Sequence, residues 1–143
     1  MNQLRPNLTH LARVLLVLIF LINGFGIVTP AMATHDMVQR GVPSHLAGLL
    51  CIAGRIVDVV AGFGLIFGVY RRLCALALIA LLISATLIAH TFWSAPSALY
   101  QIQLVNFFKN ISLLGGLLFI ACHQSKPEEA TDRASTATDR VPC

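Results

Sequence analysis

The chain has 143 residues, of which 57% are hydrophobic and only 11% are charged. Ordinary soluble domains carry about 25% charged residues, so this composition excludes a soluble globular enzyme and predicts a protein embedded in the lipid bilayer. The net charge of +4 is not arranged as a basic stripe with interleaved aromatic residues, so a nucleic-acid partner is not expected.

Four apolar runs are long enough to cross a bilayer, at about 11–28, 46–70, 73–89 and 104–122. Helices are predicted because lipid offers no partner to an open strand edge, and four spans are too few for a barrel. The sequence therefore predicts an all-α integral membrane protein, a four-helix transmembrane bundle formed by residues 1–122. Residues 123–143 are polar and show no apolar period, so we expect them to form a disordered cytoplasmic tail.

Basic residues around the first span and after the second indicate the orientation of the bundle. Arg5 and Arg13 flank the first span, and Arg71 and Arg72 fill the short connection between the second and third spans. Because Lys and Arg favour the cytoplasmic side of a membrane, both termini are expected in the cytoplasm.

A second interpretation of the N-terminal region stays open. The first apolar run is followed by Ala31-Met32-Ala33, which has the form of a signal-peptide cleavage site. Cleavage there would leave three spans and move the new N-terminus outside. An uncleaved first span is favoured because such small-residue patterns are frequent in alanine-rich sequences.

The second span carries two opposite charges, Arg55 and Asp58, near its middle. A lone charge at this depth costs at least roughly 2.5–3.5 kcal/mol, so the two residues need a partner or a task. Residues three apart share one helix face, and Arg55 and Asp58 are therefore predicted to pair. The alternative is an ion pair that only fixes helix packing.

Small residues in the second and fourth spans predict close helix contacts. Gly64 and Gly68 form a G-x-x-x-G pattern, which allows the backbone of another helix to approach. Gly115 and Gly116 are expected to act in the same way. These patterns concern packing and indicate no chemistry.

The third span ends at His90, and the fourth carries Asn106 and Lys109 near its predicted start. In the expected topology these groups lie in the outer half of the bundle with Asp58. We therefore predict a polar pocket formed by Asp58, His90, Asn106 and Lys109, with Arg55 at its rim. Taken singly, His90 is as well explained as an interfacial residue, and Lys109 as a side chain that reaches the headgroups.

Neither a catalytic residue nor a metal site is predicted. The four cysteines include no C-x-x-C pair, which argues against an exchanging dithiol. The five histidines are scattered along the chain and do not show the spacing of metal or haem ligands.

Several short motifs resemble those of the DoxX family of small four-span bacterial membrane proteins, in its DoxX-like branch. The similarity covers roughly residues 11–121, and its most specific part is VNFFKNISLLGG at 105–116. The other matching positions are Arg13, Phe20 and Gly24 in the first span, Asp58, Gly68 and Arg72 around the second, and IAHTFW at 88–93.

Two positions depart from the family pattern. Asp58 stands where the family usually has Glu, and Ile27 stands where it often has Lys. We expect Arg55 to replace that missing charge from the neighbouring helix.

The resemblance implies a bacterial inner-membrane location and an association with redox enzymes, since some relatives look like subunits of thiosulfate:quinone oxidoreductases. The leading expectation is a redox-associated membrane subunit that binds a quinone headgroup through Asp58, His90, Asn106, Lys109 and Arg55. Electrons would come from a membrane oxidoreductase partner subunit, and a homo-oligomer is also compatible with the sequence. The alternatives are a structural or interaction protein without catalytic activity, and a small-molecule or proton carrier.

Overall fold

The structure, a computed structural model, describes residues 4–27 and 30–123, with side chains for 7–27 and 34–123. Within these ranges it consists of helices only. In chain order the elements are α1 (Leu4–Gly24), α2 (Pro30–Gln39), α3 (Ser44–Phe67), α4 (Arg71–Ala89), the 3₁₀ turn η1 (Phe92–Ser94) and α5 (Ser97–Cys122). Four of them, α1, α3, α4 and α5, are long and apolar enough to cross a membrane, which confirms the predicted fold class.

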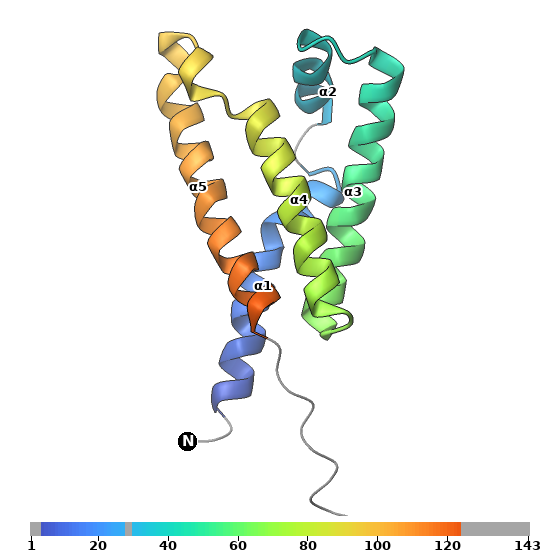
Figure 1. The fold of residues 1–143 in the computed structure, drawn as a ribbon, viewed down its shortest axis with the longest axis vertical. Helices are drawn as coiled ribbons and strands as arrows, with labels where there is room; N and C mark the ends of the chain where they lie inside the picture. The colour runs from blue at the N-terminus through green and yellow to red at the C-terminus, as the bar shows by residue number, and fades with distance from the viewer. Residues whose placement is uncertain (1–3, 28–29, 124–143) are drawn as a thin grey trace, which may run out of the picture.

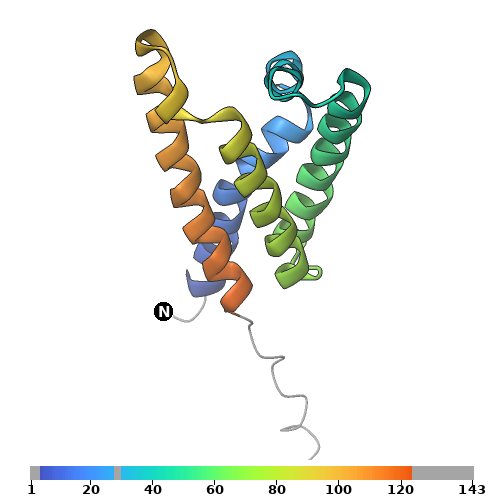
Figure 2. The same cartoon turned by 45° about the horizontal axis from the view of Figure 1, so that its top comes forward.

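Helix α4 lies between α3 and α5, and α1 crosses behind α4 (Figures 1 and 2). The main packing partners are α4 with α5, α1 with α3, and α3 with α4, whereas α1 and α5 touch only briefly. The start of α1, the turn between α3 and α4, and the end of α5 lie at one end of the bundle, called the terminal end below (Figure 1). The side of the membrane that this end faces stays a prediction. Of the tail predicted at 123–143, residues 124–143 lie outside the described residues.

Two helix boundaries differ from the predicted spans because of local capping. Helix α1 ends at Gly24 and not at 28, since Gly26 adopts a left-handed φ of 74°. The Gly26 amide donates to Asn23 and the Ile27 amide to Ile22, which is the Schellman pattern that ends a helix. Helix α5 begins at Ser97, seven residues before the predicted 104, directly after Pro96.

Helix α2 was not predicted, because the region after the first span was interpreted as a loop. Its ten residues begin with Pro30, whose fixed φ suits the first helical position. It packs mainly on α3 and more lightly on α4, opposite the terminal end (Figure 1). Ala31 to Ala33 belong to this helix, and cleavage after them stays untested.

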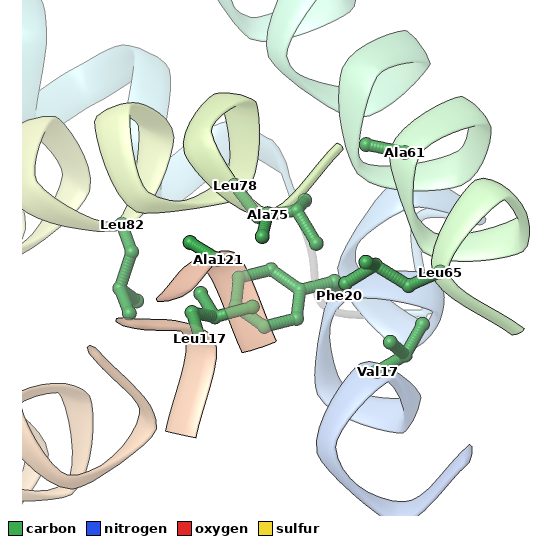
Figure 3. Close-up of a cluster of buried hydrophobic side chains, with 9 residues drawn as sticks. All are labelled: Val17, Phe20, Ala61, Leu65, Ala75, Leu78, Leu82, Leu117 and Ala121. Atoms are coloured by element: carbon green, nitrogen blue, oxygen red, sulfur yellow. The ribbon is translucent and has the colours of Figure 1, made fainter. Parts of the chain in front are cut away.

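The buried core lies toward the terminal end, where α1, α3, α4 and α5 come together (Figure 3). Phe20 reaches from α1 toward Leu117 and Ala121 of α5 (Figure 3). Three of the core members are alanines, which allow helix backbones to approach closely. The core residues are Val17, Phe20, Ala61, Leu65, Ala75, Leu78, Leu82, Leu117 and Ala121. Most large apolar side chains instead point outward, as expected for a protein surrounded by lipid.

The glycines contribute to packing in a way that only partly follows the prediction. A Cβ on Gly64 would lie about 2.5 Å from the Cys74 sulfur, so Gly64 brings α3 and α4 together. Gly116 similarly admits Leu16 of α1, whereas Gly115 has no neighbour within 4 Å. Gly68 instead ends α3 with a left-handed φ of 79°, and a Cβ there would meet the Arg71 side chain at the start of α4.

Candidate functional site

Arg55 lies in the middle of α3 and contacts the end of α1. Its Nε donates a hydrogen bond to the carbonyl oxygen of Gly24 at 3.2 Å. The guanidinium rests against Gly26, where an added Cβ would lie 2.8 Å from Cζ. A cation at a helix C-terminus stabilises carbonyl groups that have no partner within the helix. Arg55 therefore caps α1. That it replaces the missing family lysine near Ile27 stays a prediction.

The predicted ion pair between Arg55 and Asp58 is not formed. Arg55 shares a face with Val59 and Gly62, both of which pack against α1. Asp58 belongs to a different stripe with Gly54 and Ala61, on the side of α3 that faces α4. The two side chains therefore turn toward different helices. Asp58 is half-buried and makes no hydrogen bond or ion pair with any described residue.

His90 ends α4 and is bound to α5. Its Nδ1 lies 2.9 Å from Oε1 of Gln103, and because an amide oxygen only accepts, His90 donates this bond. Nearby, Nη2 of Arg40 donates to Thr91 Oγ1 at 2.8 Å, which ties the end of α2 to the turn after α4. Both contacts hold α2, α4 and α5 in fixed relation at the end opposite the termini.

These contacts border a groove with a volume of about 560 Å³, called the polar groove below. Its polar lining comes from α2 and Arg40 directly after it, from the segment between α4 and α5, and from Gln103 of α5. Ile88 and Leu99 form part of its apolar lining. The polar residues are His35, Asp36, Gln39, Arg40, Thr91, Ser94 and Gln103. The Nδ1 of His35 lies 3.8 Å from a carboxylate oxygen of Asp36, so the groove contains an adjacent acid and base.

Asn106 and Lys109 do not reach this groove. Lys109 Nζ donates to Asn106 Oδ1 at 3.1 Å, and Lys109 is exposed on α5. Because α5 starts at Ser97, Asn106 lies about 14 Å along the helix from its start, deeper than predicted. Helices α3 and α5 do not pack against each other within the described chain.

The five predicted residues therefore do not gather in one pocket among the described residues. Arg55 lines a separate groove of about 340 Å³ with Gly24 and Val59. Asp58 faces α4, and His90 joins α5 near its start. The prediction assumed that equal depth in the membrane brings residues together, whereas the order of the helices around the bundle keeps them apart.

Sequence reasoning missed two polar features. The first is the polar groove, most of whose residues lie on α2 or in the turn after α4. The spacing of His35 and Gln39, four residues apart as on one helix face, was a sequence signal that could have predicted α2. The second is a buried bond in which Asn110 Nδ2 donates to Thr86 Oγ1 at 2.9 Å, joining α5 to α4. Thr86 also donates to the Leu82 carbonyl, so its hydroxyl both accepts and donates a hydrogen bond.

Comparison with known proteins identifies relatives of this sequence. The DoxX family model matches residues 8–91, which cover most of the described chain from α1 through α4 and end before α5. The chain is 30% identical over 122 residues to the inner membrane protein YphA of Escherichia coli (strain K12), which covers 82% of this chain and 83% of that protein. No solved structure matches.

Proposed function

The chain belongs to the DoxX family of membrane proteins, and from this premise we propose that it is a redox-associated inner-membrane subunit that holds a quinone headgroup in the polar groove. The observation that carries the proposal is the groove itself. It combines hydrogen-bonding groups, an apolar wall and an acid–base pair at one end of a transmembrane bundle. This site replaces the pocket expected from the sequence.

The groove fits the chemistry of a quinone headgroup. Such a headgroup needs donors for two carbonyl oxygens, an apolar surface for the ring and access to lipid for its tail. Arg40, Thr91 and Gln103 provide donors, and Ile88 and Leu99 provide apolar surface. The volume of about 560 Å³ falls within the range of roughly 300–1,000 Å³ that is usual for small-molecule sites.

The protein's own residues would bind and orient the headgroup. Gln103 Oε1 is held by His90, which directs the Nε2 amide of Gln103 away from His90 as a donor. Arg40 is steadied by Thr91, so its remaining N–H groups are preorganised. His35 and Asp36 can exchange protons with a ligand at the groove. A bound quinone supplies two-electron chemistry, and the electrons would come from a partner subunit.

Trp93 gives a direct test because it is the one tryptophan in the sequence and neighbours Ser94 of the groove. Its ring packs edge-on against Phe92, at a centroid distance of 5.2 Å. A short-chain quinone, ubiquinone-1, is titrated into the purified full chain in detergent while Trp93 fluorescence is followed. We expect saturable quenching. Gln103→Leu should weaken the quinone affinity about tenfold, because it removes one hydrogen bond to the headgroup.

The matched control is Gln101→Leu, which removes an exposed amide two residues away on the same helix and outside the groove. This variant should quench like the wild type. Linear, unsaturable quenching of all three proteins would refute the proposal, because it would indicate collision within the micelle only. Equal weakening by both variants would also refute it.

A structural role without catalysis is the second candidate. It is favoured by Arg55, whose intramembrane charge is used to cap α1. This role predicts no saturable quinone binding, although substitution of Arg55 would still destabilise the fold. The quinone titration therefore separates the two functions.

A further inference from the structure

Helices α1 and α5 meet only near the terminal end of the bundle. There Gly116 of α5 packs against α1, where an added Cβ would lie 3.0 Å from Cδ1 of Leu16. Further along α1, Leu21 and Gly24 pack against α3 instead, so α1 leaves α5 as it crosses behind α4 (Figures 1 and 2). The sides of α1 and α5 beyond the contact between Leu16 and Gly116 are called the α1–α5 seam below.

Two polar side chains lie on this seam at equal distances from the contact that closes it. Asn23 follows Leu16 by seven residues on α1, and Lys109 precedes Gly116 by seven residues on α5. Seven residues are about two helical turns, so each side chain shares a face with its contact residue and lies roughly 10 Å further from the terminal end. Both side chains are exposed, so the two helices do not cover each other at this level.

The seam lies deep within the transmembrane bundle. Lys109 is at the middle of α5. Asn23 directly precedes Gly24, whose carbonyl oxygen accepts a hydrogen bond from Arg55 in the middle of α3. Lipid at this depth offers no hydrogen-bond partner, so an exposed cation and an exposed amide are both unfavourable there.

The described residues satisfy these two groups only in part. Lys109 Nζ donates one hydrogen bond, to Asn106 Oδ1 at 3.1 Å, and makes no ion pair within the described chain. An ammonium group has three donors, so two remain available. The side chain of Asn23 makes no hydrogen bond to any described residue, and its amide oxygen is an acceptor. The α5 side of the seam therefore has spare donors, and the α1 side has a spare acceptor.

We propose that the α1–α5 seam is the interface between two copies of this chain, in which Lys109 of each copy donates to Asn23 of the other. A twofold axis along the membrane normal makes this interface isologous, so the hydrogen bond between Lys109 and Asn23 forms twice. Rotation about that axis keeps every residue at its own depth, and the two residues already lie at about the same depth. Hydrogen bonds between polar side chains are a general source of helix association in lipid.

The test measures association of the purified full chain in lipid. Chains labelled at the N-terminus with a donor or an acceptor dye are reconstituted together in phosphatidylcholine vesicles, and energy transfer is followed as the lipid-to-protein ratio rises. The wild type should follow a monomer–dimer equilibrium. Lys109→Met should weaken association about eightfold, because two symmetric hydrogen bonds of average strength in a membrane are lost together. Asn23→Leu should weaken it to the same extent.

A mixture of the two variants tests whether Lys109 and Asn23 meet each other. In a dimer of one Lys109→Met chain with one Asn23→Leu chain, one pair is apolar on both sides and the other pair keeps both polar partners. Association between the two variants should therefore be about threefold stronger than association within either one.

Ser84→Ala is the control, because Ser84 is an exposed polar residue on the spanning helix α4, where its hydroxyl donates to the Ala80 carbonyl. This variant should associate like the wild type. Circular dichroism in vesicles must show an unchanged helix content for each variant. If Lys109→Met does not fold, comparison of Asn23→Leu with Ser84→Ala still decides, because Asn23→Leu removes the same hydrogen bond from its other side.

Four results would overturn the proposal. A chain that stays monomeric at every dilution does not associate with itself through this seam. Unchanged association of Lys109→Met would show that the lysine reaches the lipid headgroups instead. Equal weakening by Lys109→Met and Ser84→Ala would place the contact on another surface. A mixture that associates no better than either variant alone would show that Lys109 and Asn23 do not meet.

Discussion

Replacing Gly26 with Ala tests whether Arg55 caps α1. Two glycines, Gly26 and Gly41, end their helices with left-handed φ values of 74° and 87°. At both positions an added Cβ makes the left-handed backbone conformation less favourable by about 1–2 kcal/mol. They differ in surroundings, because the Cβ at Gly26 would lie on the Arg55 guanidinium, whereas the Cβ at Gly41 has nothing within 4 Å.

The difference between the two variants gives the contribution of the Arg55 contact. Displacing the guanidinium breaks the bond to Gly24, which is long at 3.2 Å. A hydrogen bond from a charged group contributes about 1.5–3 kcal/mol, and we take the lower end for this length. Gly26→Ala should therefore lower the free energy of unfolding by about 1.5 kcal/mol more than Gly41→Ala does.

The assay is reversible unfolding of the purified chain by SDS in mixed micelles, followed by far-ultraviolet circular dichroism. The same pair of variants is then measured in an Arg55→Ala background. Without the guanidinium, the excess cost of Gly26→Ala should disappear. Equal costs for Gly26→Ala and Gly41→Ala in the wild type, or an excess that survives Arg55→Ala, would refute the capping role.

Two further predictions concern packing between α4 and its neighbours. Gly64→Ala should destabilise the chain by about 1–3 kcal/mol because its Cβ meets the Cys74 sulfur. Gly54→Ala, whose Cβ would lie 3.7 Å from Leu81, should be nearly neutral in the same SDS titration. Asn110→Leu should lower the free energy of unfolding by about 0.6–1.7 kcal/mol, because the hydrogen bond to Thr86 is lost. A double-mutant cycle with Thr86→Val should show coupling between the two positions. Strictly additive effects of the two substitutions would contradict that hydrogen bond.

The four spans were predictable because each is a long apolar run and the bilayer permits few other structures. The ends of the spans were less predictable, since hydropathy ignores capping. Helix α1 stops where Gly26 turns, although the sequence stays apolar through Val28. Helix α5 includes Ser97 to Gln103, which hydropathy assigned to a loop.

The candidate site was harder to predict than the fold. Spacing placed Arg55 and Asp58 on one face, but positions three apart differ by about 60° around a helix axis, enough to face different neighbours when packing is close. The order of helices around the bundle also decides which residues meet, and no hydropathy pattern encodes that order. The structure shows the Arg55 guanidinium against Gly26, which precedes Ile27 in the chain, while the replacement of a family lysine by Arg55 stays a prediction.

The outward-facing apolar side chains have a consequence for how this sequence can diverge. A lipid chain adapts to any apolar shape, so Leu, Ile, Val and Phe on that surface are interchangeable as long as they stay apolar. Positions such as Ala61, Ala75 and Gly64 tolerate little, because another helix already occupies the space that a larger side chain would need. We therefore expect sequence differences among relatives to concentrate on the lipid-facing surface.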